Sequence, residues 1–476
     1  METKERVRKW AGICYMVCLA VFLAYRAFDN TMIRKEFGIT RCVPLEYCWM
    51  AVMILVIIVR MVYLKSYSKL ELLVAVSFCA AMFLAWRCSG RYWIEMISLL
   101  VAGAKGVSFD KIIKIFLVTV GALIGLSVIL SLTGVVTNLE YIRYVPDASA
   151  PGGSIGLKRY AFGTTYPTTF SEFMFFLSAA WLYMRRRSVK IFDVIGLAAV
   201  AVLLYKGVDA ITDVACVAAL AMIALGVVIF RFVYGGAGVL RGRPEEKCER
   251  ADAGEMAGRP VERLEGADAG RPGEKRTGAA AIPDLSDRTN SDENNSLRKD
   301  RQIPRILHIL CAPLVAVTAV CATAMTVMMI CYDSTKSSWL TMDSLLHLRL
   351  SLGHAGLKEY GIHPFGALVK YRMTGGDVDL VNRADYFNLD CSYHLILLNF
   401  GVVILLFIVG LFTLACVRAW QMQDLVLLLI IVVISLECVM ENRMIHPQFD
   451  VFLLVFFADV VSRSGKRYSV ICGQQD

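Results

Sequence analysis

Long continuous runs of apolar residues recur along the whole chain and are separated by short, mostly basic linkers. A run of about twenty apolar residues can cross a ~30 Å hydrocarbon layer as an α-helix. Because the runs are continuous rather than alternating, they predict helices and not the strands of a barrel. About twelve such spans are predicted by this length criterion. They are expected at 10–28, 45–64, 70–87, 92–104, 112–135, 161–184, 191–205, 208–232, 306–331, 393–417, 423–440 and 446–462.

The composition supports the same interpretation and excludes a soluble domain. Of the 476 residues, 57% are hydrophobic and 19% are charged, whereas a soluble domain carries about a quarter charged residues. We therefore predict an all-α, polytopic transmembrane helix bundle, with the lipid bilayer as its solvent. The net charge of +9 is explained by cytosolic Lys and Arg that set topology, so nucleic acid is not an expected partner.

The basic clusters predict how the chain is threaded through the membrane. Cytoplasmic linkers are enriched in Lys and Arg, which places the N-terminal cluster at Lys4–Lys9 inside. If successive spans cross the membrane in opposite directions, all the remaining tight basic clusters lie on that same side. Both termini are therefore expected to be cytoplasmic. These clusters lie at 65–69, 105–114, 185–190, 233–305, 418 and 463–467.

Four segments follow from this threading. An N-terminal bundle, 1–232, is expected to hold about eight spans and an outer loop at 136–160. The segment 233–305 is rich in Gly, Ala, Arg and Glu and almost free of aromatics. It buries too little apolar surface to offset its ordering entropy, so a disordered cytoplasmic loop is predicted. A C-terminal bundle, 306–462, has about four spans and a large extracytoplasmic loop, 332–392, before the cytoplasmic tail 463–476.

The two outer loops carry positive charge against the topological bias. Short outer loops should be poor in Lys and Arg. An anionic ligand at the outer membrane surface explains this placement, since the planar guanidinium matches phosphate oxygens in a bidentate way. The residues concerned are Arg143, Lys158 and Arg159 in the first loop and Lys336, Arg349, Lys358, Lys370, Arg372 and Arg383 in the second.

Three stretches in these loops give the chain a resemblance to a known family. The first, Lys158–Gly163 followed by Tyr166-Pro167, is similar to an R-x-x-x-G-x-x-x-P-N pattern that opens a helix, with Thr168 in place of the Asn. The second is Arg349 followed by Glu359–Gly366, and the third is Asn388–Tyr393 followed by Leu397–Gly401. In this order they resemble Wzy-type oligosaccharide repeat-unit polymerases, which make O-antigen, capsule and exopolysaccharide chains and share a broad fold with O-antigen ligases.

The resemblance implies an enzyme of the bacterial cytoplasmic membrane. Such a membrane glycosyltransferase polymerises oligosaccharide repeat units, carried on undecaprenyl or another polyprenyl pyrophosphate, into a surface polysaccharide on the extracytoplasmic face. The flippase and the chain-length regulator of the same pathway are the implied protein partners. No cofactor is expected, because the leaving lipid pyrophosphate itself drives the reaction. No metal is expected either, since no Cys/His cluster has zinc spacing.

This chemistry requires charge stabilisation on the departing pyrophosphate and removal of a proton from the acceptor hydroxyl. We expect Arg159 and Arg349 to form the pyrophosphate clamp, with Lys158 beside them. Glu172, inside the sixth span, is expected either to face inward and pair with Lys158 or Arg159 or to be a neutral, buried glutamic acid. Four further residues are candidates for substrate contact or for the base, each with a competing role. Tyr393 orients a sugar or anchors the membrane interface, and Asp390 is the general base or a helix cap. His363 is the base or a loop histidine, and Glu441 is the base or an ion-pair partner of Arg443.

Two other functions stay open from the sequence. An O-antigen ligase-like transferase would use the same fold and clamp and differ only in its acceptor. A transporter or flippase for anionic lipid-linked substrates would more often show internal repeats with interrupted spans near the membrane midplane, and no such repeat is evident here. Elongation of carrier-linked units by the purified protein distinguishes the polymerase from both.

Overall fold

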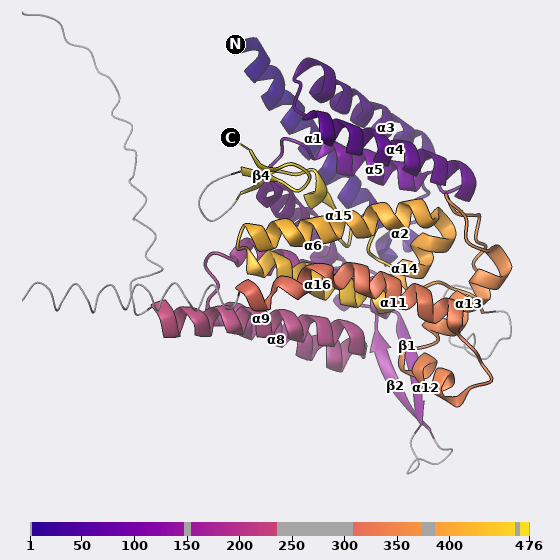
Figure 1. Ribbon diagram of the computed structural model, residues 1–476. Coiled ribbons are helices and arrows are strands. Elements are labelled where there is room, and N and C mark those ends of the chain that lie inside the picture. The colour runs from indigo at the N-terminus through magenta and orange to yellow at the C-terminus, as the bar shows by residue number, and fades with distance from the viewer. Residues whose placement is uncertain (1, 147–153, 236–307, 373–385, 462–466, 476) are drawn as a thin grey trace, which may run out of the picture. The chain divides into compact units, whose positions relative to one another are not determined.

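The computed structural model describes residues 2–146, 154–235, 308–372, 386–461 and 467–475 (Figure 1). The protein is mostly helical, and in these ranges eight helices are long and apolar enough to cross a membrane. They are α1 (Glu2–Phe28), α3 (Val43–Ile58) with the π-turn η1 (Val59–Tyr63), α4 (Lys69–Ser89), α6 (Phe109–Leu132), α8 (Ile191–Leu203) with η2 (Leu204–Val208), α9 (Ile211–Gly235), α11 (Val317–Cys331) with the preceding turns from His308 onward, and α15 (Val402–Gln421).

The remaining apolar segments differ from the twelve predicted spans. Helices α5 (Trp93–Gly103) and α16 (Leu425–Met440) are shorter than a full crossing. The described part of the predicted span 446–462 contains no α-helix. It holds the 3₁₀-helix η6 (Val451–Phe456), in which every residue is buried, and the two-residue strand β3 (Val460–Val461). Short segments that are apolar on all sides lie inside a helix bundle rather than against lipid. Hydropathy alone does not distinguish a protein environment from a lipid environment. The number of predicted spans is therefore larger than the number of long apolar helices in the described residues.

A second difference concerns the predicted span 393–417, which is interrupted. It begins as α14 (Ser392–Leu395) and the π-turn η5 (Ile396–Phe400), and α15 starts only after Gly401. Gly401 has a φ of +92°, and a Cβ there would collide with the backbone of Pro364 and Gly366. The backbone N–H of Val402 in turn donates to the carbonyl of His363 at 3.1 Å. This contact satisfies a helix-terminal donor and joins two of the stretches that carry the family resemblance.

Short strands occur where only loops were predicted. The strands β1 (Glu140–Pro146) and β2 (Ser154–Tyr160) form an antiparallel hairpin in the expected outer loop 136–160. The tail forms a three-stranded sheet from β3 (Val460–Val461), β4 (Arg467–Ser469) and β5 (Gly473–Gln475). The other elements are α2 (Met32–Glu36), α7 (Pro167–Arg185), α12 (Ser337–Leu345), α13 (Arg349–Tyr360) and η3 (Ala312–Ala316).

The chain divides into two compact units, Met1–Val228 with His308–Asp476, and Ile229–Leu307. The helices that precede and follow residues 229–307 in the sequence therefore belong to the same compact unit. Within it α16 packs against α7, α11 and α15, and α6 packs against α1 and α7. The predicted disordered loop 233–305 lies outside the described residues from 236 onward, and residues 233–235 end α9.

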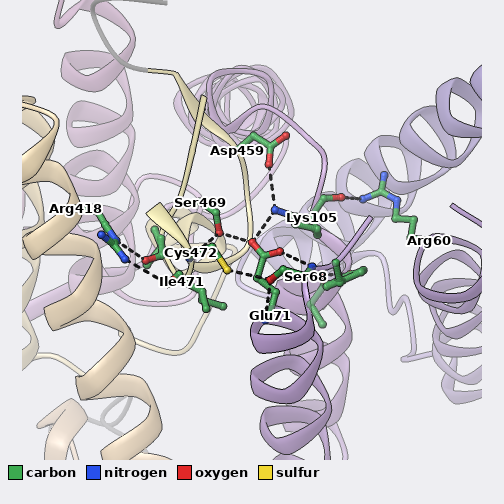
Figure 2. Close-up of polar contacts among 12 residues, drawn as sticks. Arg60, Ser68, Glu71, Lys105, Arg418, Asp459, Ser469, Ile471 and Cys472 are labelled. Atoms are coloured by element: carbon green, nitrogen blue, oxygen red, sulfur yellow. Dashed lines mark hydrogen bonds and ion pairs between the residues drawn. The ribbon is translucent and has the colours of Figure 1, made fainter. Parts of the chain in front are cut away.

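Buried polar contacts join several of the linkers that the basic-cluster rule assigns to one side. Figure 2 shows Lys105 between Glu71 at the start of α4, 2.7 Å away, and Asp459 before β3, 3.8 Å away. The hydroxyl of Ser469 in β4 donates to the same Glu71 carboxylate, and Arg60 donates to the Lys105 carbonyl. The side chains of Lys105 and Glu71 are only 4% and 2% exposed. The network thus ties the tail to helices that lie far away in the sequence.

We expect Lys105→Ala to destabilise the protein by about 3–5 kcal/mol, because it leaves the buried Glu71 carboxylate without its cation. The free energy of unfolding in mixed detergent micelles measures the effect. Lys111→Ala is the matched control, since Lys111 lies nearby in α6 with an exposed side chain. Equal stability of the two variants would contradict a stabilising role for this network.

Candidate functional site

Arg349 brings together three of the residues nominated from the sequence. It is the first residue of α13 and follows His347 and Leu348, which both have positive φ. Its Nη1 lies 3.3 Å from Oδ2 of Asp390 and its Nη2 3.9 Å from Oε1 of Glu441. Its Nε donates to the Met440 carbonyl at 2.9 Å. The guanidinium, 14% exposed, is therefore held between the loop before α14 and the end of α16.

Glu172 lies beside this group but has a different partner from the one predicted. Its fully buried carboxylate accepts a hydrogen bond from Nε of Arg443 at 2.7 Å. The prediction that it pairs with Lys158 or Arg159 is wrong. Lys158 lies on the exposed hairpin, 62% accessible, and pairs with Glu140 at 3.3 Å. The hairpin holds Lys158 at the surface, whereas the loop after α16 brings Arg443 to α7.

Arg159 lies in the hairpin and acts on a different buried carboxyl group, that of Asp213. It lies in β2 opposite Tyr141, and its Nε donates to the Val208 carbonyl at the end of η2 at 2.8 Å. The guanidinium carbon is 5.9 Å from the centre of the Tyr166 ring, and its positive charge acts on Asp213. Arg159 is thus positioned by the two segments that follow it in the chain.

Buried carboxyl groups are concentrated around these arginines. The negative charges of Glu172 and Asp213 act on both Glu441 and Glu437. Four carboxyl groups of this cluster each have one buried oxygen without a hydrogen-bond partner in the described part of the chain. These are Glu172, Asp213, Glu437 and Asp450.

The environment of Glu441 favours its protonated form. Burial raises the pKa of Glu441 well above its usual range, and the nearby charges of Glu172 and Asp213 raise it further, while Arg349 opposes them. A carboxyl group with a raised pKa next to a cation is suited to accept a proton near neutral pH. Glu441 therefore has the electrostatic environment of a general base.

The other nominated residues lie in different surroundings. The ring of His363 is exposed, and its Nε2 is 2.8 Å from the Tyr360 carbonyl. Tyr393 is fully buried, and its hydroxyl donates to the Ser435 carbonyl at 2.8 Å. That bond joins α14 to α16, so the structure brings neither side chain to Arg349.

Three residues at the site were not nominated from the sequence. Arg443 was considered only as an ion-pair partner of Glu441, yet it pairs with Glu172. Asp213, in α9, accepts a hydrogen bond from Ser171. Burial and the Asp390 charge raise the pKa of Tyr386 to about 12. Arg443, lying in a polar turn between two apolar runs, had a usable signal, because a charge in so short a turn needs a partner.

The arrangement combines guanidinium groups, which match phosphate oxygens, with carboxyl groups that can take up a proton. Comparisons of the chain with family models, with curated proteins and with solved structures find no match. The resemblance to the polymerases therefore stays a prediction, and the geometry at Arg349 is the basis for assigning a function.

Proposed function

We propose that this protein is a membrane glycosyltransferase that polymerises polyprenyl-pyrophosphate-linked oligosaccharide repeat units at the extracytoplasmic face of the bacterial cytoplasmic membrane. In this proposal the loops around Arg349 face outward and both termini are cytoplasmic. The buried segments α5, α7 (Pro167–Arg185), α16 and η6 complete a bundle of about twelve passes through the hydrophobic layer. The flippase and chain-length regulator of the same pathway are its proposed partners.

The observation that carries this proposal is the position of Arg349, held 3.3 Å from Asp390 and 3.9 Å from Glu441. In the reaction, the acceptor hydroxyl oxygen bonds to the anomeric carbon of the donor chain. The bond from that carbon to the pyrophosphate oxygen breaks, and the pyrophosphate leaves with the electron pair. The hydroxyl proton passes to a carboxylate. A guanidinium can stabilise the charge that develops on the leaving pyrophosphate, and a carboxylate beside it can accept the hydroxyl proton.

Glu441 is the carboxyl group that we assign as the base. Its pKa is raised by burial and by Glu172, which makes it a stronger proton acceptor than an ordinary carboxylate. Asp390 is assigned to orient Arg349, since one of its oxygens accepts from Asn388 at 2.6 Å and the other faces the guanidinium. Arg349 and Arg159 stabilise the charge that develops on the leaving pyrophosphate.

The test is elongation by the purified protein in lipid vesicles. Lipid-pyrophosphate-linked repeat units from a producing strain are incubated with the protein, and the products are resolved by gel electrophoresis. We expect a ladder of lengthened, lipid-linked chains that is absent from vesicles without protein. Units that stay single in the presence of folded protein would contradict the proposal. Transfer of intact chains to a different acceptor, without lengthening, would support the ligase instead.

A transport function is the second candidate, because the buried carboxyl groups favour it specifically. Carriers use chains of intramembrane Asp and Glu residues as proton relays, and Glu172, Asp213 and Glu437 have unpartnered buried oxygens. Movement of a fluorescent lipid-linked sugar between leaflets, dependent on a pH gradient and without lengthening, would support this function over the polymerase.

A further inference from the structure

A second group of arginines lies close to the site but takes no part in the clamp described above. Arg26 is in the last turn of α1 and Arg91 is in the link between α4 and α5. Together with Arg443 they act electrostatically on one imidazole, that of His446. The indole of Trp93 stacks on the same imidazole with ring centres 4.9 Å apart. Three guanidinium groups from separate parts of the chain thus act on one imidazole.

Two nitrogen atoms in this group are buried and have no hydrogen-bond partner among the described residues. They are Nε of Arg91 and Nδ1 of His446. Arg91 is held in place on its other side, where Nη2 donates to the Val369 carbonyl at 2.8 Å and the guanidinium lies 4.9 Å from the centre of the Tyr371 ring. A buried N–H left unpaired destabilises a protein. The Nε–H of Arg91 is therefore held in a fixed position and is free to bind an acceptor that the described residues do not supply.

The carboxylates nearby are engaged elsewhere. Asp29 lies 3.5 Å from Arg26 but 2.5 Å from Arg34. Glu46 is bound to Arg41 at 2.5 Å. Arg91 makes no ion pair with any residue that the structure describes. The group therefore carries an excess of positive charge. The Nε–H of Arg91 and the Nδ1–H of His446, in that tautomer, are donors suited to phosphate oxygens.

We propose that Arg91, Arg26 and His446 form a second binding site for the pyrophosphate group of a lipid carrier. The inference rests on the proposed function, in which two lipid-linked substrates react and each carries a pyrophosphate. One pyrophosphate leaves at Arg349. The other belongs to the acceptor, is separated from the reacting hydroxyl by the sugars of one repeat unit, and must be held at a different place. The lipid tails keep both groups at the same membrane surface, and Arg443, which acts on His446, pairs with Glu172 of the candidate site.

The number of polyprenyl pyrophosphate molecules bound by the purified protein tests this inference. The probe is a polyprenyl pyrophosphate without sugar, counted by native mass spectrometry of the protein released from detergent. We expect two molecules on the wild type, one on Arg91→Gln, one on Arg349→Ala and none on the double variant. Arg26→Gln should weaken the second site by about tenfold or more, as expected for loss of a charged hydrogen-bond donor. Arg87→Gln, an exposed arginine near the end of α4, should bind two.

The outcomes separate this inference from the function on which it rests. A single molecule on the wild type, lost in Arg349→Ala and retained in Arg91→Gln, would overturn the second site and leave the polymerase standing. A wild type that binds none would contradict both. Equal binding of phosphatidylglycerol, or of inorganic pyrophosphate alone, at the Arg91 site would also overturn the assignment to a lipid carrier. Arg91→Lys keeps the positive charge but has no donor at the Nε position, so it should regain part of the binding. Partial recovery shows that a folding defect in Arg91→Gln does not imitate the loss.

Discussion

Replacing Arg349 with alanine is expected to lower the rate of chain elongation by about 10²- to 10³-fold, the usual effect of removing one donor that stabilises developing charge. The guanidinium is the cation placed against both Asp390 and Glu441, so its removal also leaves two carboxyl groups facing the incoming pyrophosphate. That repulsion adds to the loss. The rate of ladder formation by the purified variant in vesicles, at saturating substrate, measures the effect.

The matched control for this experiment is Arg372→Ala. Arg372 lies in the same predicted outer loop, is exposed and pairs with Glu359 at the surface, where a single ion pair contributes little. It should elongate chains at the wild-type rate. Arg349→Lys should recover only part of the rate, because an ammonium cannot replace the bidentate fork. Wild-type activity of a folded Arg349→Ala protein would remove this residue from the clamp.

Replacing Glu441 with glutamine is expected to lower the elongation rate by about 10²- to 10⁴-fold, the range of a lost general base. Glutamine keeps the size of the side chain and cannot accept the proton. The pKa of Glu441 is raised well above its usual range by burial and by Glu172 and Asp213. Only the deprotonated carboxylate accepts a proton, so the wild-type rate should rise as pH increases through that raised pKa. The residual rate of Glu441→Gln should lack this rise.

Two further variants distinguish the base from its neighbours. Asp390→Asn keeps the hydrogen-bonding shape next to Asn388 and Arg349, and it should lower the rate while preserving the pH profile. His363→Ala removes an exposed ring and should leave both unchanged. If the pH dependence disappeared in Asp390→Asn and persisted in Glu441→Gln, the base would be Asp390.

Much of the helical framework could be predicted because hydropathy is a local property of the chain. The predicted spans 70–87, 112–135 and 208–232 correspond to α4 (Lys69–Ser89), α6 (Phe109–Leu132) and α9 (Ile211–Gly235). The candidate site was predictable in part for a related reason. Charge on loops between apolar runs is conspicuous, and Arg349, Asp390 and Glu441 were nominated on that ground before the structure brought them together.

Other features depend on neighbours that are distant in the sequence. The last predicted span contains the buried η6 (Val451–Phe456), since an apolar run reads the same whether lipid or protein surrounds it. The partner of Glu172 was missed because Arg443 is 271 residues away along the chain. Lys158 and Arg159 are closer to Glu172 along the chain, but the hairpin register directs Lys158 to the surface.

The amino-acid sequence by itself determined that this chain belongs in a membrane, where most of its helices run, and which loops carry unusual charge. These properties follow from the free energy of transfer of each segment from water to lipid, which depends on the residues of that segment alone. The tertiary structure alone decided which charges meet. Pairing of Arg349 with Asp390 and Glu441, and of Arg443 with Glu172, depends on how α7, α13 and α16 pack, because an ion pair is set by distance in space.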